Sequence, residues 1–86
     1  MAYNIVYKKS VYRDLKKLSK TEAKRILDLI ETELIKMPES NPTLKGQFAG
    51  LRKYRIGDYR VIYALLGLDI IILRIGNRKE VYKGEI

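Results

Sequence analysis

Three strand-like segments, separated by very short turns, occupy the second half of the sequence. The segments span residues 51–56, 59–66 and 69–75, and the sequences GD at 57–58 and GLD at 67–69 mark the turns between them. Turns this short connect antiparallel neighbours, because a parallel pair needs a crossover of about a dozen residues or more. The sequence therefore predicts a meander of three antiparallel strands. The last strand, DIIILRI, is apolar almost throughout, which is typical of a central strand that is covered on both faces.

The first half of the sequence has a helical period after one short strand. The strand is expected over residues 3–8, where β-branched and aromatic residues alternate weakly. Ser10 is a candidate N-cap for the helix that follows. On this helix the apolar residues repeat at helical spacing, and the charged residues fall outside them. The apolar positions are Val11, Tyr12, Leu15 and Leu18, and the outward positions are Arg13, Asp14, Lys16 and Lys17.

A second helix follows almost directly. Ser19 and Glu22 have the spacing of a capping box, and Pro38 ends the helical pattern. Because the two helices are joined so tightly, we expect them to form an antiparallel hairpin. Residues 38–50, which contain both prolines, form the loop that leads to the meander. The apolar stripe of the second helix consists of Ala23, Ile26, Leu27, Ile30, Leu34 and Met37.

These elements predict an α+β fold with the order βααβββ. We expect an antiparallel sheet of about four strands with a helical hairpin packed on one face. A short edge strand around Val81 and Tyr82 is expected to follow the meander. The chain has no internal repeat or domain boundary, so residues 1–86 are interpreted as a single domain.

Composition excludes several classes of site. The 86 residues include no cysteine and no histidine, so disulfides and thiolate metal sites are excluded and the two commonest transition-metal ligands are absent. No apolar run approaches the roughly 20 residues of a membrane span, and the start lacks the apolar core of a signal peptide. We therefore expect a cytoplasmic protein without a metal or cofactor.

Positive charge dominates the chain. The formal net charge is +8, from 18 lysines and arginines against 10 aspartates and glutamates. Such an excess favours an anionic partner such as nucleic acid, and it favours fast association that depends on salt.

Strand alternation predicts where the cations of the meander lie. The economical arrangement directs Tyr54, Ile56, Tyr59, Val61 and Tyr63 toward the helices. Lys53, Arg55 and Arg60 then gather on the open face, and Arg74, together with Ile70 and Ile72, can approach the same surface. Clustered cations repel one another unless an anion bridges them, and arginine offers a planar fork to phosphate. The alternative is a wet face on which these cations pair with Asp58, Asp69 or Glu80.

Four segments carry a resemblance to a known family. LKG at 44–46, LRKYRIGDYRVIY at 51–63, IGNRKEVYK at 75–83 and YKKSVYRDLKKLSK at 7–20 resemble the RelE/ParE toxin superfamily, especially its RelE-like branch. The resemblance covers nearly the whole chain in the right order. It implies a toxin of a type II toxin–antitoxin system, with a RelB-like antitoxin as its partner.

RelE-like members cleave messenger RNA in the ribosomal A site, without a metal or cofactor. The resemblance implies that Lys53 is the candidate base, with a purely electrostatic contact as the alternative, and that Arg60 holds the scissile phosphate. It implies that Arg78 stabilises the developing charge or acts near the leaving group. It places Tyr82 where the family has a tyrosine that stacks on a base or orients the 2′-hydroxyl. We expect Arg52, Arg55, Arg74 and Lys45 to contact RNA phosphates.

Two positions depart from the family pattern. Asn77 stands where many relatives have histidine, so chemistry that depends on this histidine is excluded. Leu51 stands where some active relatives have the first of two strand lysines.

Two other functions share this fold. A ParE-type toxin inhibits DNA gyrase by binding and does not need the set Lys53, Arg60, Arg78 and Tyr82. A regulatory member without activity binds its antitoxin and operator DNA. Lys16, Lys17, Lys20 and Lys24 on the helices are candidates for additional ribosome contacts or, more simply, for a solvated helix face.

Overall fold

The computed structural model describes residues 3–44, 46 and 49–77. The chain begins with strand β1 (Asn4–Tyr7), followed by helices α1 (Lys9–Lys16) and α2 (Lys20–Thr32). Two short 3-10 turns, Leu34–Lys36 and Pro38–Ser40, lead into the loop before the meander. The remaining strands are β2 (Arg52–Ile56), β3 (Tyr59–Leu66) and β4 (Asp69–Asn77).

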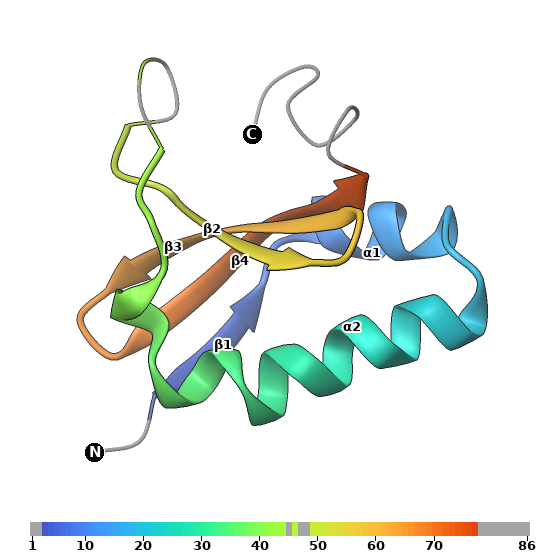
Figure 1. The fold of residues 1–86 in the computed structure, drawn as a ribbon, viewed down its shortest axis with the longest axis horizontal. Coiled ribbons are helices and arrows are strands. Elements are labelled where there is room, and N and C mark those ends of the chain that lie inside the picture. The colour runs from blue at the N-terminus through green and yellow to red at the C-terminus, as the bar shows by residue number, and fades with distance from the viewer. Residues whose placement is uncertain (1–2, 45, 47–48, 78–86) are drawn as a thin grey trace.

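Both helices pack on the same face of a four-stranded sheet (Figure 1). This confirms the α+β fold, the helical hairpin and the meander. The meander turns have Gly57 and Gly67 at positive φ, a conformation that other residues rarely adopt. Within the described residues, no helix is long and apolar enough to cross a membrane.

The sheet is mixed, which corrects the expectation of an antiparallel sheet. The strand order is β1-β4-β3-β2, and β1 runs parallel to β4 from the pair Asn4 and Asp69 to the pair Tyr7 and Ile72. The pairs β2–β3 and β3–β4 are antiparallel. The chain between β1 and the meander contains both helices, which provide the long crossover that a parallel pair requires. β4 therefore lies between two strands, as its apolar sequence indicates.

The helix starts differ from one another. Ser19 caps α2, and its hydroxyl oxygen accepts a hydrogen bond of 3.2 Å from the Glu22 backbone N–H, as predicted. The prediction that Ser10 caps α1 is wrong. The residue at the N-cap is Lys8, with no side-chain cap, and the Ser10 hydroxyl donates instead to the carbonyl oxygen of Leu73 at 2.7 Å.

The outward face of α1 was also predicted incorrectly. Asp14 is only 6% exposed, whereas Tyr12 is 56% exposed. The reason is that α1 uses a polar contact with β4, described below, in addition to Val11, which is fully buried. At the other end of the helical segment, Met37 is 60% exposed, because α2 ends at residue 32 and the chain leaves the helical path.

A single apolar core lies between the helices and the sheet. The helices contribute residues at helical spacing, and the strands contribute alternate residues. The buried core residues are Val11, Ile26, Ile30, Leu34, Ile56, Val61, Tyr63, Ile70, Ile72 and Ile75.

Candidate functional site

One extra residue in β4 determines which side chains of that strand face the open side of the sheet. Tyr63 of β3 pairs with Ile72, but the next residue of β3, Ile62, pairs with Arg74. Leu73 therefore has no partner on β3. This β-bulge reverses the alternation of side chains in the rest of the strand.

The bulge places Arg74 on the open face. Without it, Arg74 would lie opposite Val61, which is fully buried in the core. With it, Ile75 lies opposite Val61 and is buried, and Arg74 lies opposite Ile62, on the other face of the sheet from the core. Strict alternation along β4 groups Arg74 with Ile70 and Ile72, but both isoleucines lie in the core. The prediction that Arg74 lies on the same face as Lys53 and Arg60 is confirmed. Its cause is the β-bulge, which strict alternation of side chains does not predict.

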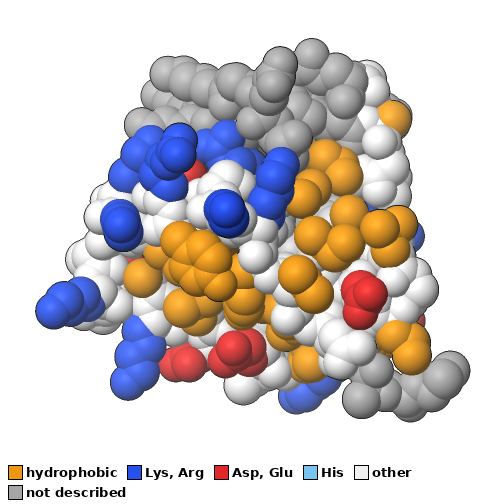
Figure 2. All heavy atoms as spheres, turned by 180° about the vertical axis from the view of Figure 1, so that it is seen from behind, with side chains coloured by type: hydrophobic (Ala, Val, Ile, Leu, Met, Phe, Trp, Pro, Cys, Tyr) orange, Lys and Arg blue, Asp and Glu red, His pale blue; other side chains and the backbone are white. Residues whose placement is uncertain are grey.

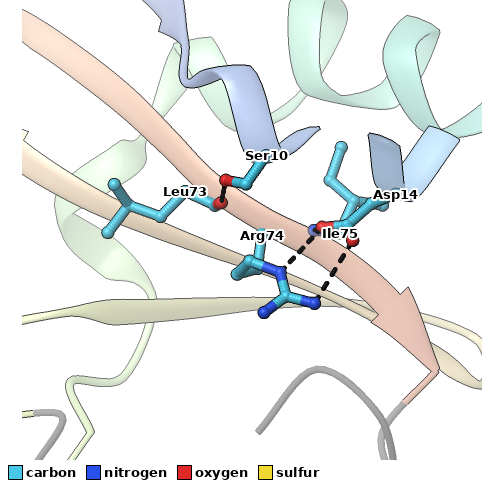
Figure 3. A network of polar contacts seen from close by, with 5 residues as sticks. All are labelled: Ser10, Asp14, Leu73, Arg74 and Ile75. Carbon is cyan, nitrogen blue, oxygen red and sulfur yellow. Dashed lines mark hydrogen bonds and ion pairs between the residues drawn. The ribbon is translucent and has the colours of Figure 1, made fainter. Parts of the chain in front are cut away.

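Helix α1 completes the edge of β4 beyond the end of β1. The Ser10 hydroxyl donates to the carbonyl of Leu73, and the Asp14 Oδ2 atom accepts a hydrogen bond of 3.0 Å from the Ile75 backbone N–H (Figure 3). Ser10 and Asp14 are one helical turn apart and lie on one face of the helix. Their side chains thus satisfy backbone groups that a longer first strand would have paired with.

Asp14 also forms an ion pair with Arg74. Two guanidinium nitrogens of Arg74 donate to the carboxylate, with Nε at 2.9 Å from Oδ2 and Nη2 at 3.2 Å from Oδ1 (Figure 3). The arginine side chain is 18% exposed and that of Asp14 is 6% exposed. The carboxylate therefore holds the guanidinium in a bidentate geometry and at the same time binds the backbone of β4.

The predicted cations of the meander share one face of the sheet. Lys53 of β2 and Arg74 of β4 lie opposite Ile62 of β3, one on each side. In the next row of this face, Arg55 of β2 pairs with Arg60 of β3. Diagonal neighbours in adjacent strands are about 7–8 Å apart at the backbone, so Arg60 lies within reach of both Lys53 and Arg74.

Arg60 is buried without an acidic partner among the described residues. Only 8% of it is exposed, and its Nη1 atom donates to the backbone carbonyls of Gly57 and Tyr59, both at 3.1 Å. The nearby Arg55 is exposed, and its Nε atom donates to the same Gly57 carbonyl at 3.5 Å. A buried cation normally has a carboxylate partner, because removal from water is costly. Among the described residues, Arg60 has only the dipoles of two backbone carbonyls as partners.

The alternative of a neutralised wet face receives little support in residues 3–44, 46 and 49–77. The ion pairs there are Lys36–Glu33 and Arg74–Asp14, so Lys53, Arg55 and Arg60 form none. Asp69 accepts a hydrogen bond from the Asn4 side chain. The third proposed partner, Glu80, lies outside the described residues.

The structure does not bring Arg52 into this group. Arg52 lies opposite Tyr63, on the face that the helices cover, and its Nη1 atom donates to the carbonyls of Glu39 and Asn41. The Tyr63 hydroxyl donates to the carbonyl of Pro38 and accepts a hydrogen bond from Asn41. Burial raises the pKa of Tyr63, so this phenol stays neutral as a fixed donor to the loop.

The other tyrosines of the meander and of β1 also belong to the covered side. Tyr54 and Tyr59 pack against the core, as predicted for both. Burial, with the nearby Glu31 carboxylate, raises the pKa of Tyr7 to about 12. These phenols support the fold, and none of them faces Arg60.

Three predicted site residues, Lys45, Arg78 and Tyr82, lie outside the described residues. Conversely, the contacts of Ser10 and Asp14 with β4 were not predicted from the sequence. Their spacing of four residues on a helix, with Asp14 next to the apolar positions, was the available signal. It was interpreted as a capping serine and an outward charge.

Basic side chains extend beyond the open face. Seen from behind, lysines and arginines gather on the side of the molecule that carries α1, next to a band of hydrophobic side chains (Figure 2). The helix lysines of the sequence analysis, Lys16, Lys17, Lys20 and Lys24, are exposed and form no ion pair among the described residues.

Comparison with known proteins identifies relatives along almost the whole chain. The family described as ParE toxin of type II toxin-antitoxin system, parDE, matches residues 5–82. A protein from Methanocaldococcus jannaschii, named as the candidate toxin RelE1, is 36% identical over 93 residues, which cover 96% of this chain and 98% of that protein.

Two solved structures extend the comparison. The RelBE2 toxin–antitoxin complex of Mycobacterium tuberculosis matches with a TM-score of 0.84 and 25% identity, covering 91% of this chain and 100% of that one. The archaeal RelE–RelB complex of Pyrococcus horikoshii matches with a TM-score of 0.65 and 32% identity, covering 93% and 99%.

Proposed function

The chain belongs to the ParE toxin family of type II toxin–antitoxin systems, and on this basis we propose that it is a ribosome-dependent endoribonuclease that cleaves messenger RNA in the A site. The RelE relatives support this branch of the superfamily over the gyrase inhibitors. The observation that carries the proposal is the state of Arg60, a buried guanidinium without a carboxylate partner in the described part of the chain.

A phosphodiester is the anion that suits this position. Arg60 is buried beside Arg55 and is diagonal to Lys53, so cations converge where no acidic side chain of the described residues balances them. A phosphate has the tetrahedral oxygens that a guanidinium fork and an ammonium group can bind together. The favourable interaction with the substrate then offsets the cost of keeping Arg60 buried and unpaired.

In the proposed reaction, the ribose 2′-oxygen attacks the adjacent phosphorus, and the bond from phosphorus to the 5′-oxygen breaks. A base removes the 2′-hydroxyl proton, and an acid delivers a proton to the 5′-oxygen, so that the products are a 2′,3′-cyclic phosphate and a 5′-hydroxyl. Lys53, in its unprotonated form, is the candidate base. Arg60 binds the phosphate oxygens and stabilises the charge of the transition state.

Arg78 and Tyr82 complete the proposed set. Arg78 is proposed to stabilise the leaving group, and Tyr82 to stack on a base or orient the 2′-hydroxyl. Both roles rest on the family resemblance of the segment IGNRKEVYK.

We also propose a RelB-like antitoxin as the partner. Two of the related structures are complexes of a RelE-type toxin with its antitoxin. The net charge of +8 suits an acidic partner.

Gyrase inhibition is a second candidate function, because the matching family is described as ParE. A gyrase inhibitor acts by binding and has no need of a phosphodiester site. The two functions therefore predict different effects of changes at Arg60.

The test is to add the protein to translating ribosomes and to map messenger 5′ ends. We expect cuts at the A-site codon with the wild type and a loss of at least about 100-fold with Arg60→Ala, the scale of removing a charged group from a transition-state site. Arg25→Ala is the matched control, because Arg25 is exposed on α2 and lies outside the site. Inhibition of gyrase supercoiling without cuts would overturn the proposal and favour the second candidate.

A further inference from the structure

We propose that Asp14 is a positioning residue, which holds Arg74 so that the free part of its guanidinium contacts an RNA phosphate next to the one bound by Arg60. The inference rests on the proposed function and deepens it. It assigns a role in substrate binding to a carboxylate on α1, the helix that packs beside β4.

The hydrogen bonds of Arg74 leave part of its fork available. A guanidinium has five N–H donors. One from Nε and one from Nη2 bind Asp14. No other residue of the described chain accepts a hydrogen bond from Arg74, and its side chain remains 18% exposed. Arginine can therefore bridge two anions here, with the Asp14 carboxylate on one side and a phosphate on the other.

The place of Arg74 on the face fits this role. Lys53 and Arg74 lie on either side of Ile62, and Arg60 is two residues from Ile62 on the same strand. The three cations thus form a triangle whose sides follow the strand and row spacings of the sheet. A single-stranded RNA that places one phosphate at Arg60 and Lys53 brings a neighbouring phosphate toward Arg74.

The orientation of the Arg74 side chain is fixed by the backbone of β4 and also by the ion pair with Asp14. Asp14 binds Arg74 and the Ile75 N–H with the same carboxylate, directly after the bulge that turns Arg74 outward. The Arg74 side chain is thereby fixed at both ends, at its Cα by the sheet and at its guanidinium by Asp14. A preoriented group loses less conformational freedom when it binds a ligand.

Two roles of Asp14 predict opposite changes in RNA affinity when its charge is removed. One role is simple electrostatic repulsion of phosphate, and the other is the positioning of Arg74. If Asp14 acts only as a nearby negative charge, Asp14→Asn strengthens RNA binding, because an anion that repels phosphate is lost. If Asp14 positions Arg74, the same change weakens RNA binding. Asparagine keeps an oxygen that can accept the Ile75 N–H, so this variant retains the backbone contact.

The experiment measures the binding of a short single-stranded RNA with a 2′-deoxy nucleotide at the cut site, which prevents cleavage. The proteins are the wild type, Asp14→Asn, Arg74→Ala, the double variant and Ser10→Ala. Ser10→Ala is the matched control, because it removes the other side-chain contact between α1 and β4 and leaves the Arg74 ion pair in place. Thermal unfolding of each variant checks that it is folded at the assay temperature.

We expect Arg74→Ala to weaken binding about 10- to 100-fold, the range for charge-assisted hydrogen bonds, and Asp14→Asn about tenfold. The double variant should bind no more weakly than Arg74→Ala, since Asp14 acts through Arg74. The slope of log affinity against log salt should fall by about 0.7 with Arg74→Ala, as expected for one lost phosphate contact on a single strand. Ser10→Ala should change neither quantity.

Two results would overturn the inference. One is unchanged or tighter RNA binding by Asp14→Asn. The other is an equal loss on Asp14→Asn in the wild-type and Arg74→Ala backgrounds, which would indicate a purely structural role. Failure of the proposed function itself would look different, because the wild-type protein would then make no cuts at the A-site codon of messenger RNA on translating ribosomes.

Discussion

Arg60 and Arg74 lie on the same face of the sheet, but they differ in whether a carboxylate balances their charge. Arg74, beside the bulge of β4, has a bidentate carboxylate that also binds the backbone. Arg60, at the turn between β2 and β3, has only backbone carbonyls as partners in the described part of the chain. The carboxylate of Asp14 neutralises the partly buried guanidinium of Arg74, whereas the buried guanidinium of Arg60 has no counter-charge among the described residues, and we propose that an external anion supplies it.

The difference separates a cation that has an internal counter-charge from one that has none among the described residues. Breaking a buried ion pair strands a charge, so it costs stability. Removing a buried cation that has no counter-charge removes a cost, so it can leave stability unchanged or increase it while function is lost. Four changes test this contrast, from the largest expected effect to the smallest.

Deletion of Leu73 should have the largest effect. It removes the bulge and brings Arg74 opposite Val61 in the core, which leaves a buried charge without its partner. The cost of several kcal/mol is comparable with the roughly 5–15 kcal/mol stability of a domain, so we expect a chain that does not fold, as judged by circular dichroism. Leu73→Ala keeps the bulge and should fold. A deletion variant with wild-type stability would contradict the assigned register.

Asp14→Ala should destabilise the fold by about 3 kcal/mol, the lower end of the range for one lost partner of a buried ion pair. Both Arg74 and the Ile75 N–H lose their acceptor. Urea unfolding followed by circular dichroism measures the change. Asp28→Ala, which removes an exposed carboxylate on α2, is the control and should cost less than about 0.5 kcal/mol. Equal losses in the two variants would show that the buried pair is energetically ordinary.

Arg60→Met should leave the free energy of unfolding unchanged or raise it by up to about 1 kcal/mol, because an unpaired charge is replaced by an apolar chain of similar length. The same variant should lose messenger cleavage. Urea unfolding and 5′-end mapping on one preparation measure both. A loss of several kcal/mol would mean that Arg60, like Arg74, is needed for the fold.

Lys36→Ala should have the smallest effect. The pair of Lys36 with Glu33, at 3.4 Å, is exposed and lies one helical turn apart. We expect a change of about 0–0.5 kcal/mol, which high salt should abolish. Urea unfolding at low and high salt measures it. A change as large as that of Asp14→Ala would remove the distinction between exposed and buried pairs.

Much of the fold follows from local sequence. The glycine turns at 57 and 67 fix the meander, and Ser19 fixes the start of α2. The parallel pairing of β1 does not follow from local sequence, because it depends on where the helical crossover returns the chain. The burial of Asp14 and the exposure of Tyr12 also depend on a distant part of the chain. The helical period places Asp14 outside, but the unpaired backbone N–H at the edge of β4 binds its carboxylate.

The site was predictable where alternation is regular. Lys53, Arg55 and Arg60 share a face because β2 and β3 pair without irregularity. Arg52 was expected to bind phosphate from its charge alone, although its strand position places it over the loop carbonyls instead. Arg74 depends on a bulge inside DIIILRI, where successive apolar residues contain no sign of an extra residue.

The unpaired residue of β4 also affects how this chain should be compared with its relatives. Beyond Leu73, inward and outward positions are exchanged relative to a regular strand that starts at the same turn. An alignment gap placed one position away would match Arg74 with core residues of another toxin, and Ile75 with residues on the opposite face of its sheet. Equivalent residues in this part of the family are therefore best assigned by superposing the backbones before the amino-acid sequences are aligned.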